Sequence, residues 1–253
     1  LVRYTGSKNR RDFFGLVLCI ALGWWSKYSI VFLAAAILFG LLLTRYRFLF
    51  IQAKTYLAAA FGFLIILPNL WWQYAHHWPV LHHMKELRET QLAFVNPVDF
   101  MIDQLLLLLP VLIIWVAGLF WFFTQSIYRV IGWIYLLVIV LLIAGSGKNY
   151  YSLGIYPVLL AGGAVAWEQW TQSKKWIRYV LLFSIIGITI PFLRIGLPME
   201  EPEALTTYYE KKGYARLGIL EWEDHQNHAL PQDFADMLGW KELAEKAELF
   251  FDK

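Results

Sequence analysis

Long apolar runs without a charged residue constrain this chain more than any other feature of its sequence. Uncharged runs at or near the length of a membrane-spanning helix occupy residues 55–75, 104–128, 130–147 and 149–167. A helix needs about 20 mostly apolar residues to cross the hydrocarbon core of a bilayer. Each run is therefore predicted to cross a membrane once.

The composition agrees with an all-α membrane protein of several spans. Of the 253 residues, 59% are hydrophobic and 16% are charged, whereas a soluble domain is roughly 45–50% apolar and about 25% charged. A soluble fold of this size still exposes much of its surface, so it could not bury that excess. Disorder is excluded too, because disordered chains have low hydrophobicity. The single Cys19 rules out an intrachain disulfide.

The formal net charge of +3 conceals two parts of opposite character. Residues 1–197 hold 16 Lys and Arg against 6 Asp and Glu, a net of +10, and residues 198–253 hold 6 against 13, a net of −7. We predict a transmembrane region at 1–197 and a small soluble tail at 198–253 that stops before a domain is complete. In the tail, residues 240–251 place their apolar side chains on one helical face, which predicts a helix packed into a core.

Residues 13–43 form a longer apolar run with one charge, Lys27, near its middle. Basic clusters flank the run on both sides, and Lys and Arg favour the cytoplasmic face of a membrane. Two short passes joined at Lys27 keep both clusters on that face, so we predict a hairpin over 13–43. The alternative is one continuous helix that crosses once.

The remaining spans, with a shorter one near 176–193, then alternate in direction. This topology puts loop 76–103 and the tail outside. The basic residues that collect on the cytoplasmic side are Arg3, Lys8, Arg10, Arg11, Arg45, Arg47, Lys54, Arg129, Lys174, Lys175 and Arg178. Those in the outer loops or at the outer margin are Lys85, Arg88, Lys148 and Arg194.

Two lysines are candidates for binding an anionic group at the outer face. Lys27 is an ionisable residue within a membrane segment, which is a functional hypothesis by default; the alternative is that its amine only snorkels to the interface. Lys148 follows a glycine-rich turn and precedes Tyr150 and Tyr151. These residues could meet a lipid phosphate, or they could be a plain turn with interfacial tyrosines. The turn lacks the spacing of a nucleotide-binding phosphate loop.

The segment PNLWWQYAHHWP, residues 68–79, ends a span on the outer side. An aromatic belt explains its Trp residues, and a platform for a sugar or a lipid phosphate is the functional alternative. The nearby histidines match no metal-binding pattern, so no metal site and no cofactor are predicted, although a divalent metal would be compatible with the site. The loop carboxylates are Glu86, Glu89, Asp99 and Asp103, and no pair has the spacing of a general base.

Four segments together resemble a known family. They are GWWSKY at 23–28, PNLWWQYAHHWP at 68–79, KNYYSLGIYP at 148–157 and LPQDFADMLGW at 230–240. In this order they are similar to segments of bacterial lipid-linked-sugar glycosyltransferases of the GT-C superfamily. These are the family-39-like proteins related to protein O-mannosyltransferases and to the aminoarabinose transferase of lipid A.

The resemblance implies a GT-C helical bundle that transfers a sugar from a polyprenyl-phosphate donor to a glycan, lipid or protein acceptor outside the bacterial inner membrane. It implies donor-phosphate or site-lining roles for Lys27, Lys148 and Tyr151, and His77 of the aromatic segment is a further candidate for substrate binding. The family's catalytic Asp lies in the first outer loop of a chain about twice this length, so the resemblance implies that this fragment alone is inactive.

Two other functions stay open from the residues themselves. A transporter or flippase portion would place interrupted helices at the membrane midplane, and a membrane scaffold would use the acidic tail to bind a partner. Nucleic acid is not an expected partner, and membrane lipids are. If the hairpin over 13–43 forms, Lys27 and the region around His77 should both lie near the outer surface, within one lateral cavity.

Overall fold

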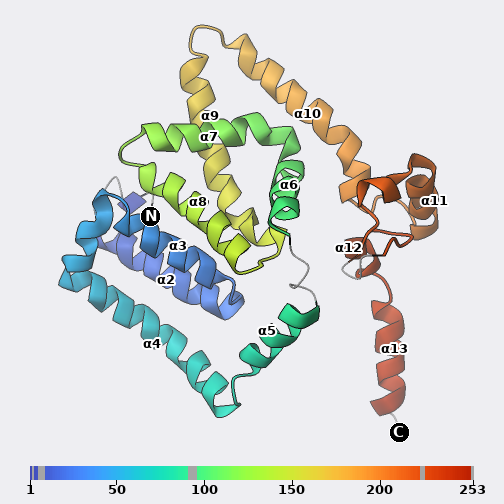
Figure 1. Cartoon of the computed structure of the whole chain (residues 1–253), viewed down its shortest axis with the longest axis horizontal. Coiled ribbons are helices and arrows are strands. Elements are labelled where there is room, and N and C mark those ends of the chain that lie inside the picture. Colours follow the sequence, from blue (N-terminus) through green and yellow to red (C-terminus); the bar gives the residue numbers. More distant parts are fainter. Residues whose placement is uncertain (2, 5–8, 91–95, 223–225, 252–253) are drawn as a thin grey trace. The chain divides into compact units, whose positions relative to one another are not determined.

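The computed structural model describes residues 1, 3–4, 9–90, 96–222 and 226–251, almost all in helices (Figure 1). Lys8, one of the predicted cytoplasmic cations, lies outside the described residues. The chain forms two compact units, Leu1–Leu182 and Phe183–Lys253. This boundary follows contacts and falls inside a helix, whereas the composition changes at Pro198; the predicted division at 197/198 stays a prediction.

The first unit consists of helices joined by short turns. They are α2 (Arg10–Ser26), α3 (Ile30–Leu42), η1 (Arg45–Ile51), α4 (Ala53–Ala75), α5 (Pro79–Thr90), α6 (Pro97–Leu107), η3 (Leu109–Val111), α7 (Leu112–Thr124), α8 (Arg129–Ala144), η4 (Asn149–Ile155), α9 (Tyr156–Trp170) and the start of α10 (Trp176–Gly196). Its main packed pairs are α7 with α9, α3 with α8 and α2 with α4.

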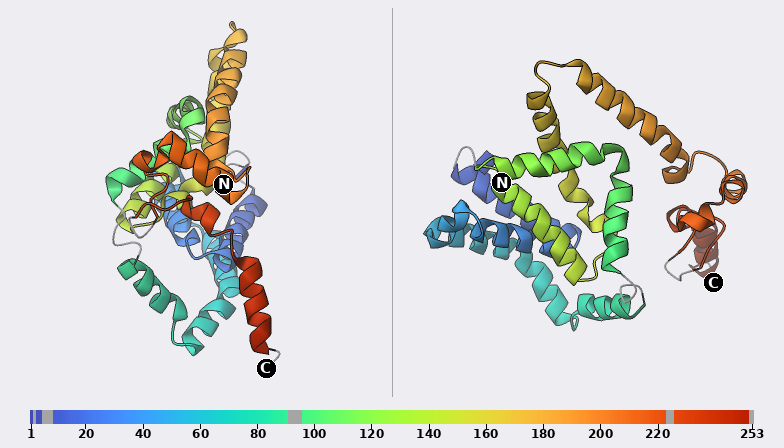
Figure 2. Two further views of the ribbon diagram at one scale, coloured as in Figure 1. Left: turned by 90° about the vertical axis from the view of Figure 1, so that its right-hand side faces the viewer. Right: turned by 45° about the horizontal axis from the view of Figure 1, so that its top comes forward.

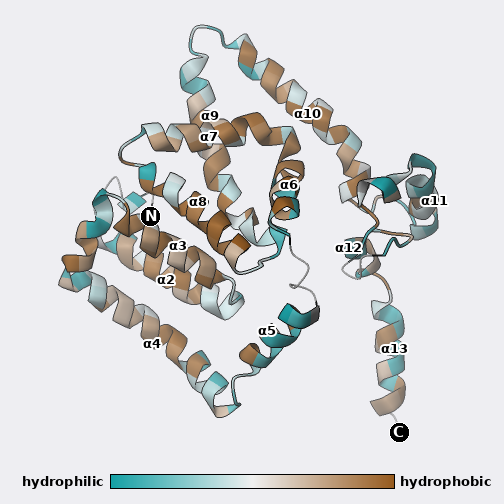
Figure 3. Ribbon diagram, viewed as in Figure 1, coloured by the Kyte–Doolittle hydropathy of each residue, from teal (hydrophilic) through white to brown (hydrophobic). Residues whose placement is uncertain are grey.

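Within the described ranges, two helices are long and apolar enough to cross a membrane, Ala53–Ala75 and Trp176–Leu193. The number rises to four if two bent pairs each count as one span. The chain is therefore an all-α polytopic membrane protein, and the apolar colouring of these helices is visible in Figure 3.

One of the two bent pairs, α6 with α7, replaces a straight span expected over 104–128, whereas α3 ends at Leu42, near the predicted end of the hairpin at residue 43. α3 and η1 meet at 103°, and α6 bends by 65° into the η3–α7 segment that follows it. The predicted single run 104–128 is thus interrupted near Pro110, which has no N–H to continue a helix. Pro157, by contrast, lies in the first turn of α9, where proline is tolerated.

Helices α7 and α9 cross in close contact (Figure 2). A Cβ built on Gly118 would lie 2.0 Å from the carbonyl oxygen of Leu159, and one on Gly163 would lie 1.9 Å from the carbonyl oxygen of Ile114. Small residues let membrane helices approach this closely. Glycine at both positions therefore fixes the distance between the two helix backbones.

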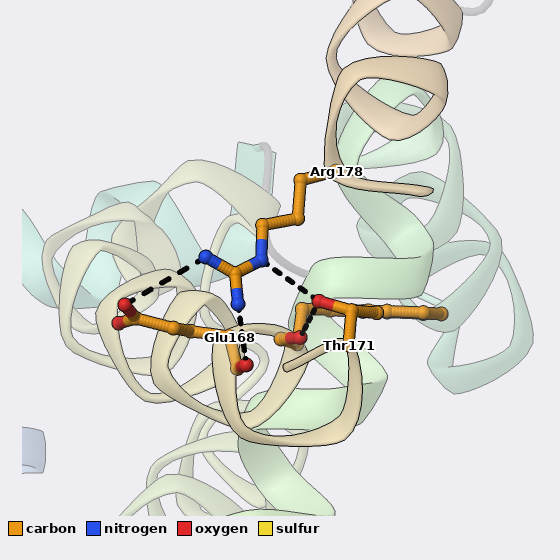
Figure 4. Close-up of polar contacts among 4 residues, drawn as sticks. Glu168, Thr171 and Arg178 are labelled. Carbon is orange, nitrogen blue, oxygen red and sulfur yellow. Dashed lines mark hydrogen bonds and ion pairs between the residues drawn. The ribbon is translucent and has the colours of Figure 1, made fainter. Parts of the chain in front are cut away.

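A polar clamp joins the end of α9 to the start of α10 (Figure 4). The Arg178 guanidinium donates to Thr171 Oγ1 at 2.9 Å and to the carbonyl oxygen of Glu168 at 2.8 Å, and it lies 3.8 Å from the Glu168 carboxylate. A cation is favourable at a helix C-terminus, where the carbonyl groups have no partner within the helix. Arg178 thus stabilises the turn between these two helices.

The second unit is small. It contains the rest of α10, α11 (Pro202–Lys212), η5 (Tyr214–Leu217), α12 (Gln232–Ala235) and α13 (Trp240–Phe251). A core of Leu205, Tyr209, Leu220 and Phe234 holds it together. Its described residues contain no strand beyond one antiparallel bridge between Glu221 and Asn227.

The predicted packing of α13 is wrong. The helix forms as expected, but none of its residues is buried. Trp240 is 67% exposed and Phe251 is 91% exposed. A helix with an apolar stripe forms from its periodicity alone, whereas burial of that stripe needs a partner surface, which the described tail does not supply.

Candidate functional site

Lys27 lies at the break between α2 and α3, where the backbone leaves the helical conformation. Its φ of −158° and ψ of 131° are extended, and its N–H donates to the carbonyl of Gly23 at 2.9 Å. A Cβ built on Gly23 would lie 2.9 Å from Ile30 Cγ1. Glycine at 23 therefore lets α2 and α3 meet in a tight turn, and Lys27 is exposed at that turn.

The Lys27 ammonium lies against two tyrosine rings of η4. Its Nζ is 5.0 Å from the ring centroid of Tyr150 and 4.5 Å from that of Tyr151. A cation within about 6 Å of an aromatic face is attracted by the ring quadrupole. The structure thus brings together Lys27 and Tyr151, two of the four site residues named from the sequence, although they are far apart in the chain.

The turn at Lys27 is also bonded to the aromatic segment at the end of α4. Asn69 Oδ1 accepts from Trp24 Nε1 at 2.8 Å and from the hydroxyl of Tyr28 at 3.1 Å. Gln73, which is 5% exposed, donates to the Tyr28 hydroxyl at 2.8 Å. Three sequence segments, 23–28, 68–79 and 148–157, therefore meet at one end of the bundle.

A cavity of about 260 Å³ lies between the first two of these segments. It is lined by Trp24, Tyr28, Gln73 and Trp78, with apolar residues of α4 and α5. The residues near Lys27 and His77, namely Trp24, Tyr28 and Trp78, share this cavity. Lys27 and His77 themselves do not line it.

His77 itself lies in a strained turn. Its φ is 60° and that of Trp78 is 58°, values that residues other than glycine seldom adopt. Within the described ranges no contact joins His77 to Lys27 or Tyr151. The strain serves the turn instead, since it lets the Trp78 N–H donate to the carbonyl of Gln73 at 2.7 Å.

A buried polar network holds η4 against α6. Gln104 is fully buried; its Nε2 donates to the carbonyl of Asn149 at 3.1 Å, and its Oε1 accepts from the hydroxyls of Ser152, at 2.6 Å, and Tyr156. Asn149 Nδ2 donates to Asp103 Oδ2 at 3.0 Å. A buried amide with its partners satisfied fixes local geometry, so this network positions the Tyr150–Tyr151 pair.

An apolar groove of about 280 Å³ runs between α3, α8 and the η4–α9 segment. Apolar side chains such as Phe32, Ile134 and Val158 make up most of its wall. Ser29, Tyr151 and Ser152 also line it, and Tyr151 is the residue whose ring faces Lys27. Lys27 does not line the groove itself and is connected to it through its contact with the Tyr151 ring.

The sequence did not single out Asn69, Gln73 or Gln104 as site residues. Each is a polar side chain inside an uncharged apolar run, and this is the signal that could have identified them, because a polar group in a membrane needs a partner. Lys148 precedes η4 and is partly buried. Asp103 is the loop carboxylate drawn into the network, through Asn149.

The arrangement contains an anchored cation, aromatic rings and an apolar groove, but it assigns no general base. Among the described residues no group of three His, Cys, Asp or Glu side chains is placed to hold a metal ion. What the geometry supports is the binding of an anionic amphiphile near Lys27.

Comparison with known proteins bears on the segment that carries Lys27. No curated protein and no solved structure matches the chain. Residues 1–72, which include α2, α3 and most of α4, match the model of the dolichyl-phosphate-mannose-protein mannosyltransferase family, whose members are membrane glycosyltransferases of the GT-C type.

Proposed function

We propose that the chain is part of an integral-membrane glycosyltransferase that transfers a sugar from a polyprenyl-phosphate donor to an acceptor at the outer face of a bacterial inner membrane. The observation that carries the proposal is the position of Lys27, against the Tyr151 ring at the polar end of an apolar groove. The family match over residues 1–72 supports it.

The groove and the cation fit the two halves of such a donor. The polyprenyl chain would occupy the groove between α3, α8 and α9, and its phosphate would lie near Lys27 and Lys148. In the reaction, the acceptor hydroxyl oxygen attacks the anomeric carbon, the bond from that carbon to the phosphate oxygen breaks, and polyprenyl phosphate leaves. Its growing negative charge would be stabilised by a nearby cation.

The proton of the acceptor hydroxyl requires a base. The resemblance places that carboxylate in an outer loop of a longer chain, upstream of the segment that carries Lys27, so residues 1–253 alone are proposed to be inactive. Their own contribution is to bind the donor and to stabilise the leaving phosphate.

The test uses the full-length protein in liposomes with a lipid-linked sugar donor. Lys27→Gln should lower the turnover roughly 10- to 100-fold, since loss of one charge-stabilising group costs that order of rate. Lys27→Arg should recover part of it. Lys174→Gln, an exposed cation on the α9–α10 turn, is the matched control. Unchanged turnover in Lys27→Gln would remove this residue from the mechanism.

A transporter or flippase is the second candidate, favoured by the bent helix pairs at α3–η1 and α6–α7. Broken helices are common where transporters bind their substrates. Movement of the lipid-linked sugar across the liposome membrane without transfer to an acceptor would favour this function over the first.

A further inference from the structure

A second group of cations lies at the outer end of the bundle, on α5. Of the predicted outer-facing basic residues, Lys85 and Arg88 are not explained by the tendency of cations to face the cytoplasm. They line a cavity of about 400 Å³ together with Leu81, Met84 and the turn at Ala144, Gly145 and Ser146.

The sequence of α5 directs both cations to this cavity. Leu81, Met84, Lys85 and Arg88 follow the spacing i, i+3, i+4 and i+7, which puts them on one helical face. At about 100° per residue, Glu86 points to the opposite side of the helix. The cavity wall that α5 contributes therefore contains two positive charges and no carboxylate, although Glu89, four residues after Lys85, lies at the edge of this face.

The opposite wall contributes a hydroxyl in a strained conformation. Ser146 has a φ of 50°, although glycine is the usual residue at such a helix end. Gly145, Ser146 and Gly147 use their N–H groups to bond the carbonyls of Leu141, Ile143 and Leu142. An anion here must consequently be held by side chains. The positive φ of Ser146 belongs to the cap that these bonds form at the end of α8, and it leaves the Ser146 side chain on the wall of the cavity.

Within the part of the chain that the structure describes, neither Lys85 nor Arg88 forms a hydrogen bond or ion pair, and neither does the Ser146 hydroxyl. An ammonium, a guanidinium fork and a hydroxyl together match the oxygens of a phosphate group.

We propose that Lys85, Arg88 and Ser146 form a second anion site, which binds a phosphate group of the acceptor. The inference rests on the proposed glycosyltransferase function. The donor phosphate is assigned to Lys27 and Lys148, and Ser146 lies two residues before Lys148 on the same connecting segment. The two sites are therefore neighbours along the chain, as an acceptor that must meet the donor requires.

The experiment measures binding of N-acetylglucosamine 1-phosphate to the full-length protein in phosphatidylcholine nanodiscs, with uncharged N-acetylglucosamine as the comparison ligand. The double variant Lys85→Gln/Arg88→Gln should weaken binding of the sugar phosphate about tenfold or more, because hydrogen bonds to charged groups are the strong ones. The control Lys174→Gln/Lys175→Gln, which changes two exposed cations elsewhere, should bind as the wild type does.

Ser146→Gly separates binding from folding. It removes the hydroxyl and the strain together, so it should weaken sugar-phosphate binding while the thermal stability stays equal or rises. A loss of both would indicate a structural role and overturn the assignment of Ser146.

Two further arms distinguish the source of the phosphate. Lys27→Gln should keep sugar-phosphate binding, and farnesyl phosphate should not displace the ligand; loss or displacement would place the ligand in the donor site and overturn the inference. Displacement by phosphatidylglycerol added to the nanodiscs would instead assign the cations to lipid headgroups. Equal binding of N-acetylglucosamine 1-phosphate and uncharged N-acetylglucosamine to the wild-type protein would also overturn the inference. These binding measurements do not require turnover, so a failure of this inference can be distinguished from a failure of the proposed reaction.

Discussion

At the scale of single residues, the structure brings together two site residues that the sequence identified separately. The sequence identified Lys27 from its place in an apolar run and Tyr151 from its place after a turn, but it could not join them. Their contact, with Nζ 4.5 Å from the ring centroid, depends on how α3 and α8 pack. His77, chosen by the same reasoning, lies in a turn that serves the local backbone.

The ring of Tyr151, rather than its hydroxyl, is expected to hold Lys27 in place. Tyr151→Phe should keep the Michaelis constant for the lipid-linked donor in the full-length protein, and Tyr151→Leu should raise it several-fold, since a cation–π contact contributes about 0.5–2 kcal/mol. Tyr179→Leu, at an exposed tyrosine on α10, is the control. Equal donor constants in the Phe and Leu variants would show that the ring does not matter.

Arg178 is expected to act on stability rather than on turnover. Arg178→Ala removes two hydrogen bonds at the end of α9, and the loss should be about 1–2 kcal/mol, because the Glu168 carboxylate is exposed and adds little. Unfolding of the protein in detergent measures this. Arg178→Lys should recover only part of the lost free energy of unfolding, since lysine cannot reproduce the guanidinium geometry. An unchanged midpoint in Arg178→Ala would contradict the clamp.

At the scale of helices, apolar runs in the sequence predicted where helices form but not where they bend. Hydropathy is nearly uniform across 104–128, so the break at Leu108–Val111 has no signal except Pro110. Proline alone is ambiguous: Pro157 starts α9, whereas Pro68 and Pro191 lie inside helices. Whether a proline starts, bends or merely occupies a helix is not set by the proline alone and depends on how the surrounding helices pack.

The glycines at the α7–α9 crossing give a test at this scale. Gly118→Ala should destabilise the protein by more than about 2 kcal/mol, because its Cβ would lie 2.0 Å from the Leu159 carbonyl oxygen and must push the helices apart. Gly187→Ala in α10, where nothing lies within 4 Å of the new Cβ, should leave stability equal or higher. Similar unfolding midpoints for the two variants would contradict the close crossing.

At the scale of the whole bundle, the first unit has two chemically different ends. One end gathers the Lys27 turn, the end of α4 and η4. The other joins η1 to the α7–α8 turn, where the Tyr46 hydroxyl donates to the carbonyl of Ile127 at 3.0 Å, and it carries Arg45, Arg47 and Arg129. Charge counting along the chain predicted the same grouping, because cations gather at one membrane face. The polar network behind Tyr151 could not be predicted that way, since it consists of uncharged groups.

The sidedness of these ends is a prediction that serine-to-cysteine variants can test. Cys19 is the single cysteine, so Cys19→Ala in the full-length protein gives a clean background for one new thiol at a time. With a membrane-impermeant maleimide, Ser26→Cys and Ser146→Cys should react in spheroplasts, and Ser126→Cys and Ser173→Cys should react only in inverted vesicles. The physical reason is that the basic turns beside Ser126 and Ser173 favour the cytoplasmic face. Thr207→Cys in the tail should react in spheroplasts, as Ser26→Cys does. Labelling of Ser26→Cys and Ser126→Cys from the same side would show that the segment between them crosses the membrane an even number of times, and the predicted order of three crossings between these residues would be wrong.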